Sequence, residues 1–181
     1  TPMIDNFDFA RLRAIGLAPA LLTSIADLPA TETPQRLMRV VEVQRDSVVG
    51  HDGDAEHRAR TLPALRNQLA DAGDALAVGD WVLAERNAFA EWWLVQRVPP
   101  ANQIARRLHD GRDKVTRAVI VANVDTALLV MGLDHDFNPR RLERYLAFVR
   151  LAQVGAVVVL TKADLCADVA EMRTTVDAIL R

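Results

Sequence analysis

The chain has 181 residues, 50% of them hydrophobic and 25% charged, and a net charge of −2, so it is no polycation that binds nucleic acid through its overall charge. No apolar run approaches the roughly 20 residues that a membrane-spanning helix needs, and no secretory signal is visible near Thr1. The single cysteine, Cys166, cannot form an internal disulfide, so we expect a reducing, cytoplasmic location and no membrane partner.

Residues 1–36 are expected to form an N-terminal helical extension. Apolar residues recur there at roughly helical spacing, interrupted by Gly16 and Pro19 and ended by Pro29.

Residues 37–100 have a different pattern, in which short β-prone runs alternate with turn residues. The strand-like runs occupy residues 38–43, 47–49, 81–84 and 92–98. The sequence His51-Asp52-Gly53-Asp54 is a strong turn signal. Residues 63–70 fit either a strand or a short helix, because Pro63 suits a first helical turn while its flanks look β-like. The pattern predicts a small all-β barrel, and a five-stranded barrel of the oligonucleotide-binding (OB) type fits best.

Three tryptophans lie in this region. We expect Trp81 to pack in the core. One ring of the Trp92-Trp93 pair must face outward if both lie in a strand, because successive side chains alternate. An outward ring is suited either to stacking on an RNA base or to an interdomain contact.

Residues 101–117 are polar and rich in arginine, and we interpret them as a basic linker. In one interpretation, its cations contact RNA phosphates, and the affinity then depends on salt concentration. The candidate RNA-binding residues are Arg106, Arg107, Arg112, Lys114 and Arg117. The alternative is a solvated linker whose charge is balanced by Asp110 and Asp113.

Residues 118–181 have the pattern of an α/β domain. The apolar runs 126–131 and 156–160 are typical of strands covered on both faces. Asn138-Pro139 predicts the start of the helix between them, so strand, helix and strand form a parallel β–α–β unit. A capping box begins at Asp168 and predicts a last helix. Two strands and two helices leave apolar faces bare, so we expect the protein to continue beyond residue 181.

The strongest chemical signal is Thr161-Lys162-Ala163-Asp164, at the carboxyl end of the second strand, where open α/β sheets bind ligands. The Asp164 carboxylate can accept two hydrogen bonds from the ring N–H and the exocyclic amine of guanine, a pair of donors that adenine lacks. The stem of Lys162 can lie across the base while its ammonium stays solvated, and Thr161 can bind neighbouring backbone. The alternative is an ordinary polar turn after a strand.

Two other clusters are assigned no chemistry. The residues around the turn at 51–57 match no metal-ligand spacing and predict a solvated hairpin. Cys166 is interpreted as a buried residue at the start of a helix rather than as a nucleophile. We therefore predict no catalytic residue and no metal ligand within this chain.

Several segments together resemble one family. Residues 123–126 (Asn-Val-Asp-Thr), 136–146 (Asp-Phe-Asn-Pro-Arg-Arg-Leu-Glu-Arg-Tyr-Leu) and 160–166 (Leu-Thr-Lys-Ala-Asp-Leu-Cys) look like the corresponding run of the ribosome small-subunit-dependent GTPase A family. Gly79-Asp80-Trp81-Val82 is similar to a signature of that family's barrel domain. The resemblance implies a multidomain protein: an all-β OB-fold barrel, then part of a circularly permuted α/β P-loop-type GTPase domain.

The resemblance also implies ligands, partners and roles. GTP or GDP would contact Thr161, Lys162, Ala163 and Asp164, with Asp164 the residue that specifies guanine. Thr161 stands where Asn is usual in the family, so its contact to the base is the doubtful one. The implied protein is monomeric and acts on the small ribosomal subunit and its 16S rRNA late in maturation. Its Mg²⁺ and structural Zn²⁺ would be held outside this chain.

The phosphate-binding sequence of a GTPase is not found among residues 1–181. Neither Gly-x-x-x-x-Gly-Lys-[Ser/Thr] nor Asp-x-x-Gly occurs. We therefore expect the 181-residue chain to bind GTP weakly and to hydrolyse none. Two alternatives stay open: a non-catalytic OB module that binds RNA or protein beside a degenerate α/β domain, and a different Rossmann-like nucleotide-binding domain.

Overall fold

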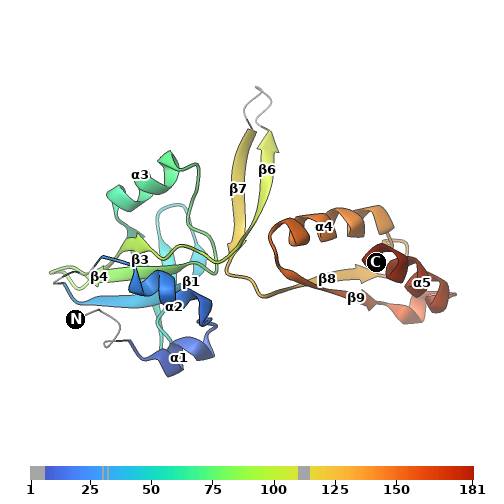
Figure 1. Cartoon of the computed structure of the whole chain (residues 1–181), viewed down its shortest axis with the longest axis horizontal. Helices are drawn as coiled ribbons and strands as arrows, with labels where there is room; N and C mark the ends of the chain where they lie inside the picture. The colour runs from blue at the N-terminus through green and yellow to red at the C-terminus, as the bar shows by residue number, and fades with distance from the viewer. Residues whose placement is uncertain (1–6, 30, 32, 110–114) are drawn as a thin grey trace. The chain divides into compact units, whose positions relative to one another are not determined.

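The computed structural model describes residues 7–29, 31, 33–109 and 115–181, with side chains for all of these except 107–109 and 115–117 (Figure 1). The chain divides into two compact units, residues 1–123 and residues 124–181. Over the described part of the chain, no helix has the length and hydropathy that crossing a membrane requires.

The first unit is built on a closed five-stranded barrel with the order β1-β2-β3-β5-β4. Its strands are β1 (Gln35–Val43), β2 (Val48–His51), β3 (Glu56–Thr61), β4 (Trp81–Arg86) and β5 (Trp92–Arg97). Neighbouring strands are antiparallel except β3 and β5, which pair in parallel and close the barrel. This confirms the predicted OB-type barrel.

Alternation along the strands gives the barrel two hydrophobic cores. Val82 and Ala84 of β4 pack inside, with side chains of the other strands and with Leu65 and Leu69 of helix α3 (Pro63–Asp71). Pro63 stands in the first turn of α3, where its missing N–H is not needed, so the segment left open between strand and helix is a helix.

The second core lies on the opposite face of β4. Trp81 and Leu83, both fully buried, pack there against helices α1 (Phe9–Ala14) and α2 (Ala20–Ala26). The two helices therefore share a core with the barrel, and Trp81 has the core position expected from the sequence.

A β-ladder follows the barrel where the sequence was interpreted as a linker. Strands β6 (Gln103–His109) and β7 (Val115–Ala122) pair in antiparallel fashion. The polar residues of 101–117 suggested an irregular segment, but the β-branched residues of 115–121 favour a strand, and pairing orders both segments.

Gly79 lies at the junction between the barrel and this ladder. Its carbonyl accepts a hydrogen bond from Nδ2 of the buried Asn123, at 3.0 Å, and Asn123 Oδ1 accepts one from the N–H of Ala101, at 2.9 Å. The φ angle of Gly79 is +91°, and a Cβ at this position would overlap the carbonyl oxygen of Ala122. Only glycine fits both the backbone conformation and the close approach.

We predict that Gly79→Ala destabilises the first unit by more than about 2 kcal/mol, because the positive φ and the overlap both act against a side chain. Gly73→Ala is the matched control, since Gly73 also has positive φ but its Cβ would meet nothing within 4 Å. That control should lose only about 1 kcal/mol. Urea unfolding measures the stability of both variants, and equal losses of stability would contradict a role for the overlap with Ala122.

Asp80 is a fully buried carboxylate next to this junction. Its Oδ2 accepts a hydrogen bond from the N–H of Ala77 at 2.9 Å and lies 3.8 Å from Nη1 of Arg97, while its Oδ1 has no partner. Arg97 makes its closer ion pair, 2.7 Å, with Asp74. Burial outweighs these contacts and raises the pKa of Asp80 to about 6.

The raised pKa predicts a pH-dependent stability. The folded state binds the Asp80 proton more tightly than the unfolded chain does, so protonation of Asp80 stabilises the fold. This contribution to the free energy of unfolding is complete below about pH 4 and is lost as the pH rises through about 6. Its size is up to about 3 kcal/mol. Asp80→Asn should therefore gain stability relative to the wild type between pH 4 and pH 7, as measured by urea unfolding at each pH. Parallel pH profiles for the two proteins would contradict the raised pKa.

The second unit is a β–α–β–α unit, as predicted. It contains β8 (Thr126–Gly132), α4 (Pro139–Leu151), β9 (Gly155–Thr161) and α5 (Val169–Leu180), with a 3₁₀ turn, η2 (Ala163–Leu165), after β9. β8 and β9 pair in parallel, with Thr126 opposite Gly155 and Gly132 opposite Thr161. Met131, Leu142, Leu146 and Val176 form the core between the strands and the two helices.

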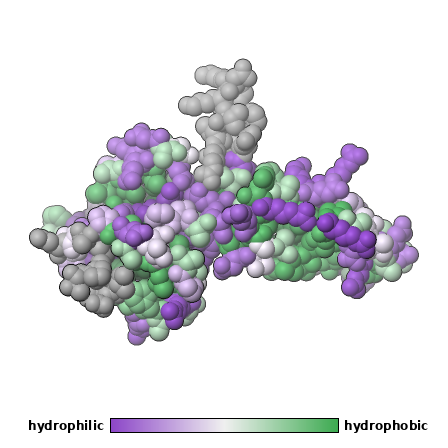
Figure 2. Space-filling model, viewed as in Figure 1, coloured by the Kyte–Doolittle hydropathy of each residue, from purple (hydrophilic) through white to green (hydrophobic). Residues whose placement is uncertain are grey.

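Residues 126–131 were expected to be covered on both faces, and in this chain they are not. Leu128 and Val130 are 65% and 63% exposed, because α4 and α5 pack on the other face of the strands. Val157 of β9 is also exposed. Hydrophobic residues accordingly gather at the surface of this unit (Figure 2), as expected for an apolar sheet face without a covering layer.

Candidate functional site

The candidate site lies at one edge of the β8–β9 sheet. Because the two strands are parallel and Gly132 pairs with Thr161, the loops that follow them begin side by side. The N–H of Leu133 donates to the carbonyl oxygen of Thr161 at 2.9 Å, which extends the pairing into the loops. Side chains at positions 134 and 162–164 are therefore brought to the same edge, where α/β sheets place their ligands.

The side chain of Thr161 contacts the backbone of the neighbouring strand β8. Its hydroxyl donates to the carbonyl oxygen of Met131 at a long 3.4 Å. The chain then turns at Lys162, which has left-handed φ and ψ angles of +57° and +38°. The N–H groups of Leu165 and Cys166 close the η2 turn on the carbonyls of Lys162 and Ala163.

The ammonium of Lys162 forms an ion pair that the sequence analysis did not anticipate. Its Nζ lies 2.6 Å from Oδ2 of Asp134, in the loop after β8. The hydrogen bond between them lowers the pKa of Asp134 and raises the pKa of Lys162. The expected solvated ammonium is thus paired. Asp134 could have been found from the sequence, because it follows the first parallel strand at the same sheet edge as Thr161.

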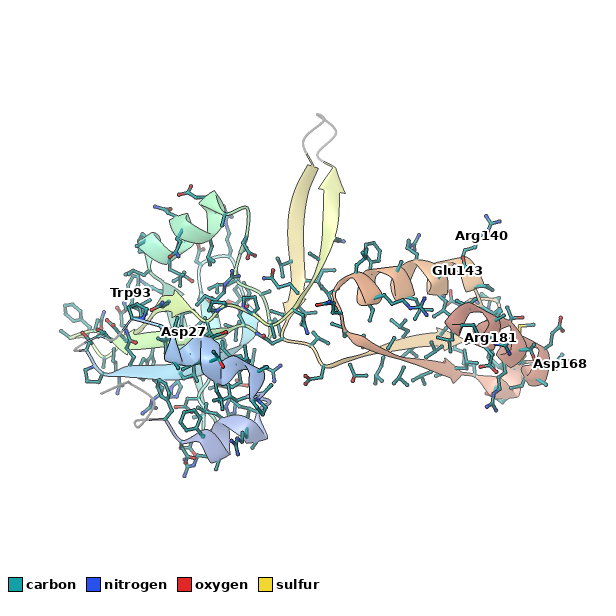
Figure 3. All side chains as sticks on the ribbon, viewed as in Figure 1. Asp27, Trp93, Arg140, Glu143, Asp168 and Arg181 are labelled. Carbon is teal, nitrogen blue, oxygen red and sulfur yellow. The ribbon has the colours of Figure 1, made fainter. Side chains whose placement is uncertain are left out.

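Asp164 lies in the η2 turn and is exposed. Within the described part of the chain, its carboxylate takes part in no hydrogen bond or ion pair, so both oxygens are available to an external donor. The turn leads to Asp168, labelled in Figure 3, whose side chain accepts a hydrogen bond from the N–H of Glu171 at 2.9 Å and caps α5. The cap fixes where the loop ends.

The start of α4 borders the same edge. Asn138 caps the helix by accepting a hydrogen bond from the N–H of Arg141, at 3.0 Å, as the sequence predicted. Arg141 also pairs with the carboxylate of Asp136, at 2.8 Å. The carboxylate of Asp136 thus pairs with a residue of α4, whereas that of Asp134 pairs with Lys162.

The five candidate RNA-binding residues are only partly described. Arg106 is exposed on β6, and the ladder places Arg107 opposite Arg117. The side chains of Arg107 and Arg117 are not described, and Arg112 and Lys114 lie outside the described residues.

Arginines that the sequence did not indicate lie beside each of the two partly buried tryptophans of β5, whose side chains alternate along the strand. The guanidinium groups of Arg36 and Arg86 lie 5.3 and 5.5 Å from the ring centre of Trp92. That of Arg60 lies 5.9 Å from the ring of Trp93, which is labelled in Figure 3. An open hollow of about 710 Å³ beside Trp92 is lined by three arginines and two acidic residues, among others: Arg45, Arg58, Arg60, Asp46 and Glu91.

The turn at 51–54 is a hydrogen-bonded hairpin. Asp52 Oδ1 accepts from the N–H groups of Asp54 and Ala55, and Asp52 Oδ2 pairs with Arg36 at 2.7 Å and with His57 at 2.8 Å. Burial alone would raise the pKa of Asp52, but these backbone and His57 contacts outweigh it and hold the pKa well below its usual range. Among the residues with described positions, no group of three or more His, Cys, Asp and Glu could hold a metal ion.

The fold defines a class: a closed OB-type barrel followed by a parallel β–α–β–α unit. The chain resembles the crystal structure of YloQ, described as a circularly permuted GTPase, with a TM-score of 0.56 and 19% identity over 83% of this chain and 49% of that one. YjeQ from Thermotoga maritima gives the same TM-score, with 18% identity over 80% of this chain and 47% of that one.

Sequence comparisons point to one family. Residues 99–180 match the family model described as RsgA GTPase. A protein of Xylella fastidiosa (strain M23), described as small ribosomal subunit biogenesis GTPase RsgA, is 38% identical over 75% of this chain and 39% of its own length. A protein of the same description from Xanthomonas campestris pv. campestris (strain B100) is 41% identical over 72% and 35%. The chain is therefore similar to the RsgA family, and it spans about two fifths of the length of these relatives.

Proposed function

We propose that this chain provides the guanine-recognition loop and an RNA-binding barrel of a GTPase that acts in biogenesis of the small ribosomal subunit. The relatives described by that activity support the proposal. The observation that carries it is the exposed carboxylate of Asp164, which has no partner among the described residues, at the carboxyl edge of a parallel sheet. The expected ligand is GTP or GDP, and the expected partner is 16S rRNA of a late small-subunit precursor.

The chemistry of the proposed recognition follows from the donors on guanine. Two carboxylate oxygens of Asp164 would accept the ring N–H and the exocyclic amine in a charge-assisted pair. The aliphatic stem of Lys162 would cover one face of the base. Thr161 holds the loop through its backbone contacts, and its hydroxyl is directed at Met131 rather than outward, so we assign it a supporting role.

Hydrolysis would need groups that residues 1–181 do not supply. The sequence has neither the phosphate-binding loop nor Asp-x-x-Gly, and the described residues offer no metal site. We therefore assign no step to Mg²⁺ or Zn²⁺ here. In this proposal the 181-residue chain binds the base end of the nucleotide weakly and turns none over.

The guanine assignment predicts a switch of base preference. In the full encoded protein, Asp164→Asn should weaken GTP binding and favour xanthosine triphosphate, because the amide offers a donor to the carbonyl that replaces guanine's amine. We expect a change of about 10- to 100-fold, as for other bidentate base contacts. Competition against a fluorescent nucleotide measures both affinities.

The matched control is Asp168→Asn, four residues further on, where Asn keeps the helix cap. This control should keep the wild-type preference for GTP. An unchanged guanine preference in Asp164→Asn would remove that residue from base recognition and leave the chain as a binding module.

The RNA part of the proposal is supported by two basic surfaces. One is the exposed Arg106 with its neighbours on the β6–β7 ladder. The other is the barrel hollow, where exposed Arg58 and Arg60 lie beside partly buried indole rings. Cations that contact phosphates, together with aromatic rings that can meet unpaired bases, are the features by which OB folds bind single strands.

For the ladder, simultaneous Arg106→Glu, Arg107→Glu and Arg112→Glu should weaken binding to small ribosomal subunits. The slope of log affinity against log salt should fall by about 2 if all three cations contact phosphates. Sedimentation binding across a salt series measures this. A control of equal charge, Arg13→Glu with Arg66→Glu and Arg140→Glu, should leave the slope closer to wild type.

The barrel hollow has a separate variant, Arg58→Glu with Arg60→Glu. If only this variant lowers the salt slope, the RNA contact lies on the barrel and the ladder assignment is wrong. If neither variant differs from the control, the proposal of RNA binding by this chain fails.

A further inference from the structure

This inference rests on the proposed function, in which residues 161–164 recognise a guanine base. It concerns the ion pair between Lys162 of that loop and Asp134 of the neighbouring loop. Asp134 belongs to none of the segments that were assigned a role in nucleotide binding, and its side chain is only 8% exposed, whereas that of Lys162 is 51% exposed.

Asp134 is held in place by its own loop. Its Oδ1 accepts a hydrogen bond from the N–H of Asp136 at 3.2 Å, and its Oδ2 receives the Lys162 ammonium at 2.6 Å. The parallel register fixes the distance between the two loops, because Gly132 and Thr161 are paired. The acceptor for Lys162 is therefore set by the sheet itself.

Gly132 makes room for this pair. A Cβ on Gly132 would lie 2.6 Å from Oδ1 of Asp134 and 3.4 Å from Cδ of Lys162. The lysine stem thus runs close over the last residue of β8, and any side chain at position 132 would displace one partner or both.

The ion pair can stabilise an unfavourable backbone conformation at Lys162. Its φ of +57° is a left-handed conformation that a lysine rarely adopts and that costs on the order of 1 kcal/mol. This residue begins the η2 turn that carries Asp164. An ion pair that holds the side chain of Lys162 also opposes rotation of its backbone out of the turn.

The geometry points to Asp134 as a positioning residue for base recognition. It holds Lys162 in its left-handed conformation before the nucleotide arrives, with the stem fixed beside the sheet edge and the η2 turn formed. Groups that are ordered in advance lose less conformational entropy on binding, so the ion pair increases affinity without touching the base.

The test is a double-mutant cycle on GDP affinity in the full encoded protein, with Asp134→Asn, Lys162→Met and the double variant. Asp134→Asn should weaken GDP binding about three- to tenfold while leaving the preference for guanine over xanthine unchanged. In the Lys162→Met background, the same change should alter affinity by less than about twofold, because the ion pair through which Asp134 acts on the loop is already gone. Asp136→Asn is the matched control, since Asp136 makes its ion pair with Arg141 and contacts Lys162 only through longer-range charge, so its coupling to Lys162 should be smaller than that of Asp134.

A second readout needs no nucleotide. In the 181-residue chain, Asp134→Asn should speed amide hydrogen exchange at Leu165 and Cys166, whose N–H groups close the η2 turn. Asp136→Asn should leave that exchange unchanged.

The outcomes separate this inference from the function on which it rests. Full additivity in the cycle, or GDP affinity and exchange unaffected by Asp134→Asn, would overturn the role of Asp134 while guanine recognition by Asp164 stands. Faster exchange with unchanged affinity would also overturn it, because the ion pair would then order the loop without aiding binding. A wild-type protein that binds no GDP would overturn the proposed function, and this inference with it.

Discussion

The candidate site depends on the parallel pairing of β8 and β9. Their register sets Gly132 opposite Thr161, so that two loops far apart in sequence start at the same point of one sheet edge. An antiparallel pair would send these loops to opposite ends. This pairing brings Asp134 within reach of Lys162, so the Lys162–Asp134 ion pair depends on it directly.

The barrel depends on a different constraint, which is the parallel closure between β3 and β5. Successive side chains of a strand alternate, so in the closed barrel those of β4 face the interior and the two N-terminal helices in turn, and Trp81 and Val82 belong to different cores. The Gly79–Asp80 turn before β4 then has to accept close backbone contact and a buried carboxylate. Gly79-Asp80-Trp81-Val82 therefore lies where the barrel packs most closely, with Trp81 and Val82 fully buried.

Much of the fold could be predicted from residues alone. Alternating apolar residues and turn signals located four of the five barrel strands but not β3, whose sequence Glu-His-Arg-Ala-Arg-Thr is mostly polar. Asn138, Pro139 and Asp168 marked the starts of α4 and α5, because capping signals act over only a few residues. The β6–β7 ladder was interpreted as a linker because its many arginines outweighed the β-branched residues of β7 in the sequence pattern. Its strands are ordered by pairing with each other, which local sequence does not show. Local sequence likewise could not decide between strand and helix at Pro63, since tertiary packing of Leu65 and Leu69 favours the helix.

The site was predictable in part, for a similar reason. Residues 161–164 form a local motif and could be identified, whereas Asp134 acts only through a partner 28 positions away. The arginines beside Trp92 and Trp93 were missed because Arg36, Arg60 and Arg86 come from three strands that meet only when the barrel closes.

The most direct test of the central claim is nuclear magnetic resonance of the labelled 181-residue chain during titration with GDP and, separately, with ADP. This measurement detects weak binding and reports it residue by residue. The account predicts that GDP shifts the amide signals of residues 161–166 and that ADP at the same concentration does not. Equal shifts with both nucleotides, or GDP-dependent shifts confined to the barrel, would contradict guanine recognition at this edge of the sheet.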